Sequence, residues 1–198
     1  MSAKQKILAC AVEELERAGV AGFSLRAVGA AAGCTPMAVY RHYRDREDLL
    51  AAVGEEAFAA WKRRIDAVRA AGALDWLRKS SRAYAEFALD QPARFDACFV
   101  LKTRVERLYP EDFAARKSPV ITLVMDRIRA AQSDGDLAPG DPLELALMLW
   151  AELHGLAMLH RAGRFTLARS AFLDLCARCV DRMLATLAPH ATNGGRAH

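Results

Sequence analysis

The side chains best suited to act on another molecule lie between residues 35 and 46, in the segment TPMAVYRHYRDR. Within it, residues 41–46 hold three arginines against one aspartate, a local charge of +2, whereas the whole chain carries only +4. Guanidinium and hydroxyl groups hydrogen-bond to phosphates and to the edges of bases. The segment therefore favours contact with a nucleic acid, although a charge run taken alone more often marks a solvated surface.

Two short helices joined by a tight turn are predicted to position these side chains. The first begins after an N-cap at Ser24 and stops at Gly33. The second begins at Thr35, has Pro36 at its first helical position, and ends near Tyr43. This pair of helices is a helix-turn-helix signature.

The spacing of apolar residues decides which side of the second helix faces outward. Val39 and Tyr43 stand one helical turn apart and face a core shared with Val28 and Ala32 of the first helix. Their burial forces the intervening residues outward. The exposed face then carries Thr35, Met37, Ala38, Arg41 and His42, with Tyr40 at its flank.

The string FSLRAVGAAAGCTPMAVYRHYRDREDLLAAV (23–53) resembles the DNA-binding module of the tetracycline-repressor (TetR) family of bacterial regulators. The match covers the helix-turn-helix at 24–43, its Tyr-x-x-aromatic ending, and the basic-x-basic-acidic-x-Leu start of the next helix at Arg44. Gly29, Cys34 and Tyr43 depart from the usual residues. We expect Gly29, in the middle of a helix, to cost about 0.5–1 kcal/mol relative to alanine.

The resemblance implies that the second helix, 36–43, enters the major groove of an operator. Arg41 is expected to read a base, while Ser24, Tyr40, His42 and Arg46 hold phosphates. Thr35 could also act simply as a helix cap. The predicted DNA-binding set is Ser24, Thr35, Pro36, Met37, Ala38, Tyr40, Arg41, His42 and Arg46.

In the rest of the chain the apolar residues also recur with the period of an α-helix, so the predicted fold class is all-α, with about nine helices. We expect a DNA-binding domain over 1–62, a helical effector-binding and dimerisation domain over 63–188, and a disordered tail over 189–198. Asp45 is a candidate N-cap for the long helix that follows the module. The other helices are expected near 4–18, 46–71, 73–90, 92–105, 112–133, 142–162 and 166–187.

A second, narrower resemblance lies in LWAELHGLAMLHRAGRF (149–165), which is similar to the Trp-x-x-x-His-Gly signature of one C-terminal subgroup of the same family. It implies a helical domain that binds an effector and forms a homodimer. Trp150 and His154 stand at i and i+4 and share a helix face. They could line a ligand pocket or form a packed core pair.

Large, soft side chains in the expected core favour a small, largely apolar effector bound between the helix 46–71 and the C-terminal core, unless the core is simply full. His154 is the leading candidate for its polar anchor. Binding of the effector would release the protein, a repressor, from a near-palindromic operator. The expected pocket residues are Trp76, Phe87, Phe95, Phe99, Met125, Trp150, His154 and Met158.

The helix at 142–162 is apolar in nearly every direction, which requires cover on all sides and predicts a homodimer built on this helix and the helix at 166–187. Two-fold symmetry would place the recognition helices about 34–36 Å apart. The expected interface residues are Leu149, Leu153, Leu156, Leu173, Val180, Met183, Leu184 and Leu187.

Other chemistries have little support. Five cysteines without an export signal indicate a reducing compartment, consistent with a cytoplasmic, nucleoid-associated bacterial protein. The pair Cys176-x-x-Cys179 is interpreted as two small hydrophobes, not a redox or zinc pair. The apolar stretch 143–160 contains Glu144, Glu152 and His154, so no membrane span is predicted.

No catalytic motif, metal or cofactor is expected. The competing interpretations are a small helical enzyme using Trp150 and His154, and a helical adaptor without DNA affinity.

Overall fold

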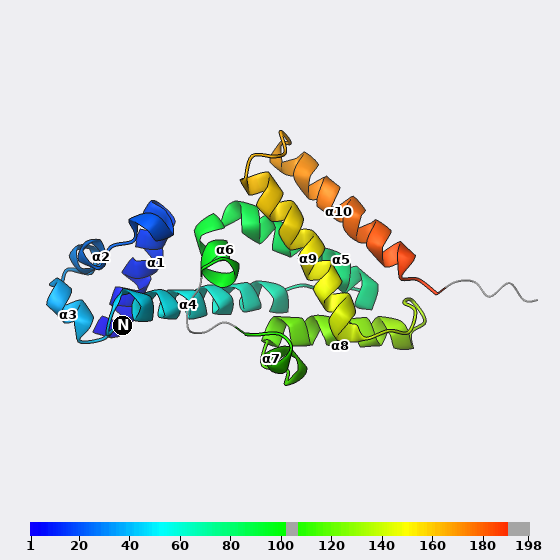
Figure 1. The fold of residues 1–198 in the computed structure, drawn as a ribbon, viewed down its shortest axis with the longest axis horizontal. Helices are drawn as coiled ribbons and strands as arrows, with labels where there is room; N and C mark the ends of the chain where they lie inside the picture. Colours follow the sequence, from blue (N-terminus) through cyan, green and yellow to red (C-terminus); the bar gives the residue numbers. More distant parts are fainter. Residues whose placement is uncertain (102–106, 190–198) are drawn as a thin grey trace, which may run out of the picture. The chain divides into compact units, whose positions relative to one another are not determined.

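The structure is a computed structural model that describes residues 1–101 and 107–189, and these residues form ten helices and no strands (Figure 1). The all-α prediction is therefore confirmed. The helices are α1 (Ala3–Gly22), α2 (Leu25–Ala32), α3 (Pro36–Tyr40), α4 (Arg46–Asp66), α5 (Ala73–Asp90), α6 (Pro92–Phe99), α7 (Glu111–Ala114), α8 (Pro119–Ser133), α9 (Pro142–Arg161) and α10 (Arg169–Thr186).

Four helices end earlier than the sequence predicts or are divided. Helix α3 ends at Tyr40 instead of residue 43, and α4 ends at Asp66 instead of residue 71. The predicted helix 112–133 is two helices, α7 and α8, which accounts for the tenth helix. Helix α6 ends at Phe99, and residues 102–105 of its predicted range lie outside the described residues. The predicted tail 189–198 lies outside them as well, except for Pro189.

The chain divides into two compact units whose bounds differ from a simple cut after residue 62. Unit 1 comprises Met1–Asp66 and Phe87–Arg107, and unit 2 comprises Ala67–Glu86 and Leu108–His198. Unit 1 takes in a later part of the chain because α6 packs on both α1 and α4.

Unit 1 has a core formed by one face each of α1, α2, α3 and α4. Ser2 caps α1 through a capping box with Gln5, whose side chain accepts from the Ser2 N–H at 2.8 Å. The backbone of α1 is interrupted at Gly19, where φ is +65° and ψ is 179°. Trp61 stacks on Phe87 with ring centroids 5.2 Å apart. This stacking joins α4 to the last turn of α5, and α6 packs on both α1 and α4.

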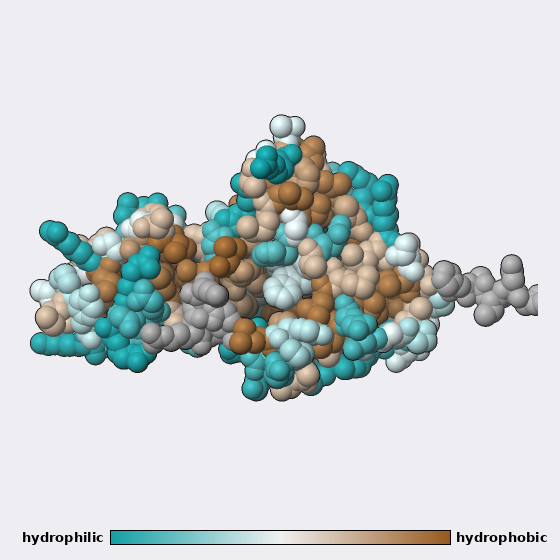
Figure 2. Space-filling view, in the orientation of Figure 1, coloured by the Kyte–Doolittle hydropathy of each residue, from teal (hydrophilic) through white to brown (hydrophobic). Residues whose placement is uncertain are grey.

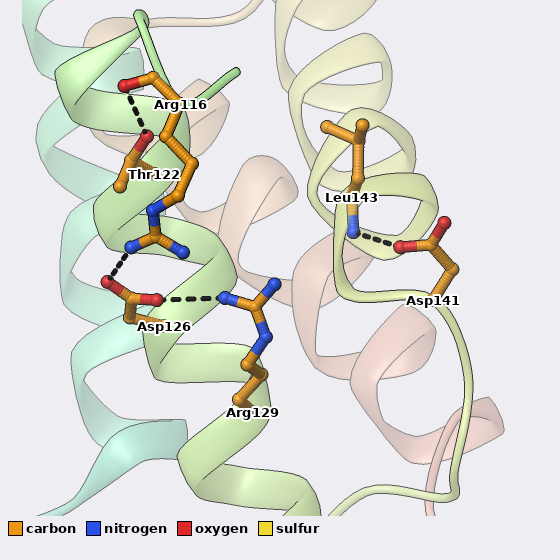
Figure 3. A network of polar contacts seen from close by, with 6 residues as sticks. All are labelled: Arg116, Thr122, Asp126, Arg129, Asp141 and Leu143. Carbon is orange, nitrogen blue, oxygen red and sulfur yellow. Dashed lines mark hydrogen bonds and ion pairs between the residues drawn. The ribbon is translucent and has the colours of Figure 1, made fainter. Parts of the chain in front are cut away.

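Unit 2 is centred on α9, which packs on α8 and α10. By length and composition α9 alone among the described helices could cross a membrane. Leu145, Leu149 and Leu153 are buried, but only 22% of its most apolar window is buried within the chain. The break between α7 and α8 falls at Arg116, whose φ is +58°. The Arg116 guanidinium donates to Asp126 at 2.6 Å, and Arg129 donates to the same carboxylate at 2.9 Å (Figure 3). These bonds tie Arg116, which precedes α8, to a residue in the middle of α8. The chain is therefore bent at Arg116, where a continuous helix was predicted.

Candidate nucleic-acid interface

Local hydrogen bonds start both short helices where the sequence predicts. Ser24 Oγ accepts from the Ala27 N–H at 3.4 Å, and Thr35 Oγ1 accepts from the Ala38 N–H at 3.3 Å. Pro36 occupies the first helical position of α3, where no N–H is needed. The two hydroxyl groups therefore act as helix caps, which supports the simpler interpretation of Thr35 and leaves its contact with DNA a prediction.

The turn between α2 and α3 is fixed by two glycines. Gly33 ends α2 in the left-handed conformation at φ +69°, which an L residue with a side chain rarely adopts. The Cys34 N–H then donates to the Gly29 carbonyl at 2.9 Å. A Cβ atom at Gly29 would lie 3.1 Å from the Cys34 carbonyl oxygen. A side chain at position 29 would therefore crowd this turn, a steric cost that opposes the helix-propensity cost expected for Gly29.

The orientation of α3 agrees with the apolar spacing. Val39 and Tyr43 are buried, whereas Met37 is 68% exposed and Tyr40 is 49% exposed. Hydrophilic side chains make up most of the surface over α3 and the first turn of α4 on the face shown in Figure 2. The remaining predicted DNA-binding residues divide into exposed ones (Thr35, Pro36, Arg41 and His42) and half-buried ones (Ser24, Ala38 and Arg46).

Helix α3 is fastened to the start of α1 through Tyr43. The Tyr43 hydroxyl donates to the Lys4 carbonyl at 3.4 Å, and the Lys4 ammonium lies 5.5 Å from the centre of the Tyr43 ring. Burial, with a smaller contribution from Asp48, raises the pKa of Tyr43, so the hydroxyl stays protonated and remains a donor. Lys4 is an exposed cation beside the interface that the sequence did not indicate, because 39 residues separate it from Tyr43.

The two arginines at the start of α4 have different surroundings. Asp45 Oδ1 accepts from the Asp48 N–H at 2.7 Å and so caps α4, as predicted. The Arg44 side chain is 71% exposed and lies 3.5 Å from the Asp48 carboxylate. The Arg46 guanidinium instead donates to the carbonyls of Val20, at 2.6 Å, and Phe23, at 3.4 Å. Nε and Nη2 of Arg46 thus bond to the protein backbone, and contact between this residue and a phosphate stays a prediction.

Two family descriptions match the chain. Residues 7–53 match "Bacterial regulatory proteins, tetR family", and residues 77–187 match "Tetracyclin repressor-like, C-terminal domain". The chain belongs to the TetR family. It is therefore a DNA-binding transcription regulator, from a family whose members are generally not enzymes, and the helix-turn-helix resemblance is confirmed. Assignment to the Trp-x-x-x-His-Gly subgroup stays a prediction.

Solved structures share the TetR-family fold across nearly the whole chain. A protein of unknown function from Rhodococcus sp. RHA1 is 28% identical, with a TM-score of 0.77 over 96% of this chain and 97% of that one. A bacterial regulatory protein in the tetR family from Rhodococcus RHA1 is 24% identical, with a TM-score of 0.66 over 96% and 100%. A TetR-family transcriptional regulator from Pectobacterium atrosepticum is 23% identical, with a TM-score of 0.69 over 93% of each chain. No curated protein matches.

The expected pocket residues of this TetR-family regulator belong to different units. Phe87, Phe95 and Phe99 lie in unit 1 and pack on one another, with centroids 6.2 Å apart for the first pair and 5.0 Å apart for the second. The other five expected residues lie in unit 2 and are Trp76, Met125, Trp150, His154 and Met158.

Trp150 and His154 are brought together by a residue that the sequence analysis missed. The Trp150 Nε1–H donates to the Tyr84 hydroxyl at 3.1 Å, and that hydroxyl lies 2.9 Å from His154 Nδ1. The Tyr84 hydroxyl accepts from Trp150, and the tautomer of His154 decides whether this hydroxyl donates to Nδ1 or accepts from it. Burial, and secondly the charge of Arg161, lowers the pKa of His154 and so favours the neutral ring.

Most of the expected dimer residues are already buried within one chain. Leu149, Leu153, Leu173, Val180 and Leu184 are buried, so they form the core of unit 2 and cannot make most of an outer surface. Leu156, Met183 and Leu187 are half-buried. The sequence identified α9 as apolar on all sides, but only the packing of α8 and α10 decides which side remains exposed.

The Cys176-x-x-Cys179 pair lies on α10, in unit 2. Burial raises the pKa of Cys176 to about 11 and also raises the pKa of Cys179. Both thiols therefore stay protonated near neutral pH, which agrees with their interpretation as small hydrophobes. Among the residues that the structure describes, no three His, Cys, Asp or Glu side chains are placed as ligands of one metal ion.

Proposed function

We propose that this TetR-family regulator is a ligand-responsive repressor that binds a near-palindromic operator through the exposed face of α3. The observation that carries this proposal is the division of α3 into a buried side at Val39 and an exposed side with Met37 and Tyr40, followed directly by the exposed Arg41. A capped helix with that face can enter the major groove while the opposite side stays packed on α2. Such a role places the protein in the cytoplasm, on the nucleoid.

Arg41 is the residue we assign to base reading. It directly follows α3 and is exposed, and a guanidinium makes the commonest specific contact to a base when it binds a guanine edge. Ser24, Tyr40 and His42 carry hydroxyl or imidazole groups suited to phosphates.

The test replaces Arg41 with alanine and measures binding to the protein's own upstream DNA. We expect a loss of about 1–3 kcal/mol and relaxed selectivity at one base position. The control is Arg63→Ala on α4, which removes the same charge from an arginine paired with Glu56 at 3.0 Å. An Arg41→Ala protein that footprints the operator unchanged would contradict the assignment.

We further propose a homodimer that forms through the exposed side of α9. Met148 and Leu159 are 47% and 46% exposed, and Ala151 and Gly155 lie on the same side, one helical turn apart. A Cβ atom at Gly155 would meet nothing within 4 Å in the single chain. Small residues between two large apolar ones allow a second helix to approach closely. This surface replaces the buried leucines as the proposed contact, and a monomer at micromolar concentration in sedimentation would refute it.

The effector is proposed to be a small, largely apolar molecule whose polar group is anchored at His154. The Trp150–Tyr84–His154 hydrogen bonds support this, because they hold the imidazole ring in a fixed orientation. A ring held in this way can exchange a hydrogen bond with the polar group of a ligand. Coupling of about 1–3 kcal/mol between effector and operator would weaken DNA binding roughly 5- to 150-fold.

A thermal-shift screen of apolar metabolites and drugs, followed by measurement of operator release, tests the effector proposal. Compounds that stabilise the protein should also release DNA. Hits that leave operator binding intact would contradict the switch, and unaltered ligand affinity in a His154→Ala protein would contradict the anchor.

A further inference from the structure

The Arg46 side chain joins the two ends of the helix-turn-helix. Its guanidinium donates to the carbonyl of Phe23, the residue immediately before the α2 cap, and to the carbonyl of Val20 in the last turn of α1. It also lies 5.7 Å from the centre of the buried Phe23 ring. Arg46 itself is the first residue of α4, three positions after Tyr43. One side chain therefore connects the chain that enters α2 with the chain that leaves α3.

The carbonyls that Arg46 binds need a donor. The last carbonyls of a helix have no partner within that helix, and a cation at this end is favoured by the helix dipole. In α1 the shortage is greater because Gly19, at φ +65°, interrupts the backbone just before Val20. The Phe23 N–H reaches the Val20 carbonyl only at 3.4 Å, whereas the Arg46 nitrogen lies 2.6 Å from the same oxygen.

The neighbouring Arg44 has none of these contacts to carbonyls. Its side chain is 71% exposed and its guanidinium faces the Asp48 carboxylate, whereas Arg46 is 37% exposed. Both residues carry the same charge at the start of the same helix. They therefore separate the effect of charge near the DNA from the effect of bonding to the α1 carbonyls.

We propose that Arg46 is a positioning residue. It sets the affinity for DNA by fixing the positions of α1, α2 and α4 relative to one another, and it does not itself bind a phosphate. This rests on operator binding by the face of α3. Without the two hydrogen bonds, the start of α2 can shift relative to α4, so a smaller fraction of the protein presents α3 in the arrangement that fits the groove.

The salt dependence of operator binding distinguishes a positioning residue from a phosphate ligand. Each phosphate contact contributes about one unit to the slope of log K against log salt. We expect Arg46→Ala to weaken operator binding about tenfold with an unchanged slope. The matched control, Arg44→Ala, removes the same charge from a side chain that pairs with Asp48, so it should weaken operator binding less than Arg46→Ala does. A slope lowered by one unit in Arg46→Ala, or an unchanged affinity, would overturn the proposal.

A third variant, Arg46→Gln, keeps a hydrogen-bond donor and removes the charge. A positioning role predicts that it recovers part of the affinity lost in Arg46→Ala, because its amide can donate to one carbonyl. If the Arg46→Ala protein does not fold, the Arg46→Gln protein still allows the affinity and the slope to be measured. Glutamine binding as weakly as alanine, with a reduced slope, would assign Arg46 to a phosphate instead. If all variants and the unmodified protein bind the operator no better than unrelated DNA, the proposed function fails and not this inference alone.

Discussion

Replacing Gly29 with alanine tests whether the turn between α2 and α3 or the helix propensity of α2 controls this position. By propensity alone, alanine in the middle of a helix should stabilise the protein by about 0.5–1 kcal/mol. In the structure the new Cβ would lie 3.1 Å from the Cys34 carbonyl oxygen and 3.5 Å from the Pro36 nitrogen, both backbone atoms. Inserting a methyl group into such a space costs about 1–3 kcal/mol. The net change should be a destabilisation of up to about 2 kcal/mol.

The displacement has a second consequence that the assay can detect. The Cys34 carbonyl can retreat only by moving the turn, and Thr35 and Pro36, which start α3, follow directly. We therefore expect weaker operator binding, measured by fluorescence anisotropy, together with a lower midpoint in thermal unfolding. The control is Ala30→Gly at an exposed position of α2, which should lose roughly 1 kcal/mol through propensity without crowding the turn. A Gly29→Ala protein with a raised melting temperature and unchanged operator affinity would refute the argument.

Three further changes have definite expected outcomes. Thr35→Ala should reduce the free energy of unfolding by about 1 kcal/mol, since it removes the α3 cap; equal chemical-denaturation midpoints would contradict this. Because the folded chain lowers the pKa of His154, the unfolded chain binds more protons below the ordinary value of 6.5, so stability should fall as pH decreases through 6.5. His154→Gln should weaken that pH dependence in denaturation curves, and an unaltered curve would count against it. Replacing Met148 and Leu159 together with aspartate should shift sedimentation from dimer to monomer while the helical circular dichroism is retained.

Much of the fold and half of the candidate site follow from local sequence. The caps at Ser24 and Thr35, the proline at the start of α3 and the left-handed Gly33 act through bonds to residues within four positions. These signals can be recognised without the tertiary structure, because the backbone groups that they hydrogen-bond lie within four residues along the chain. The inward placement of Val39 follows from helical period in the same way. The sequence by itself therefore determined the helix-turn-helix and its outward face.

Tertiary structure decided the roles that depend on distant partners. Arg46 bonds to a carbonyl 26 residues away, and Tyr84 meets Trp150 and His154 across 66 and 70 residues. No spacing rule predicts such pairs, since they depend on which helix faces pack together. The crowding that a side chain at position 29 would meet likewise comes from a turn that folds back on α2. A charge, a polar ring or a missing side chain has a definite effect only once its neighbours are in place, because hydrogen bonds and steric contacts act over a few ångströms.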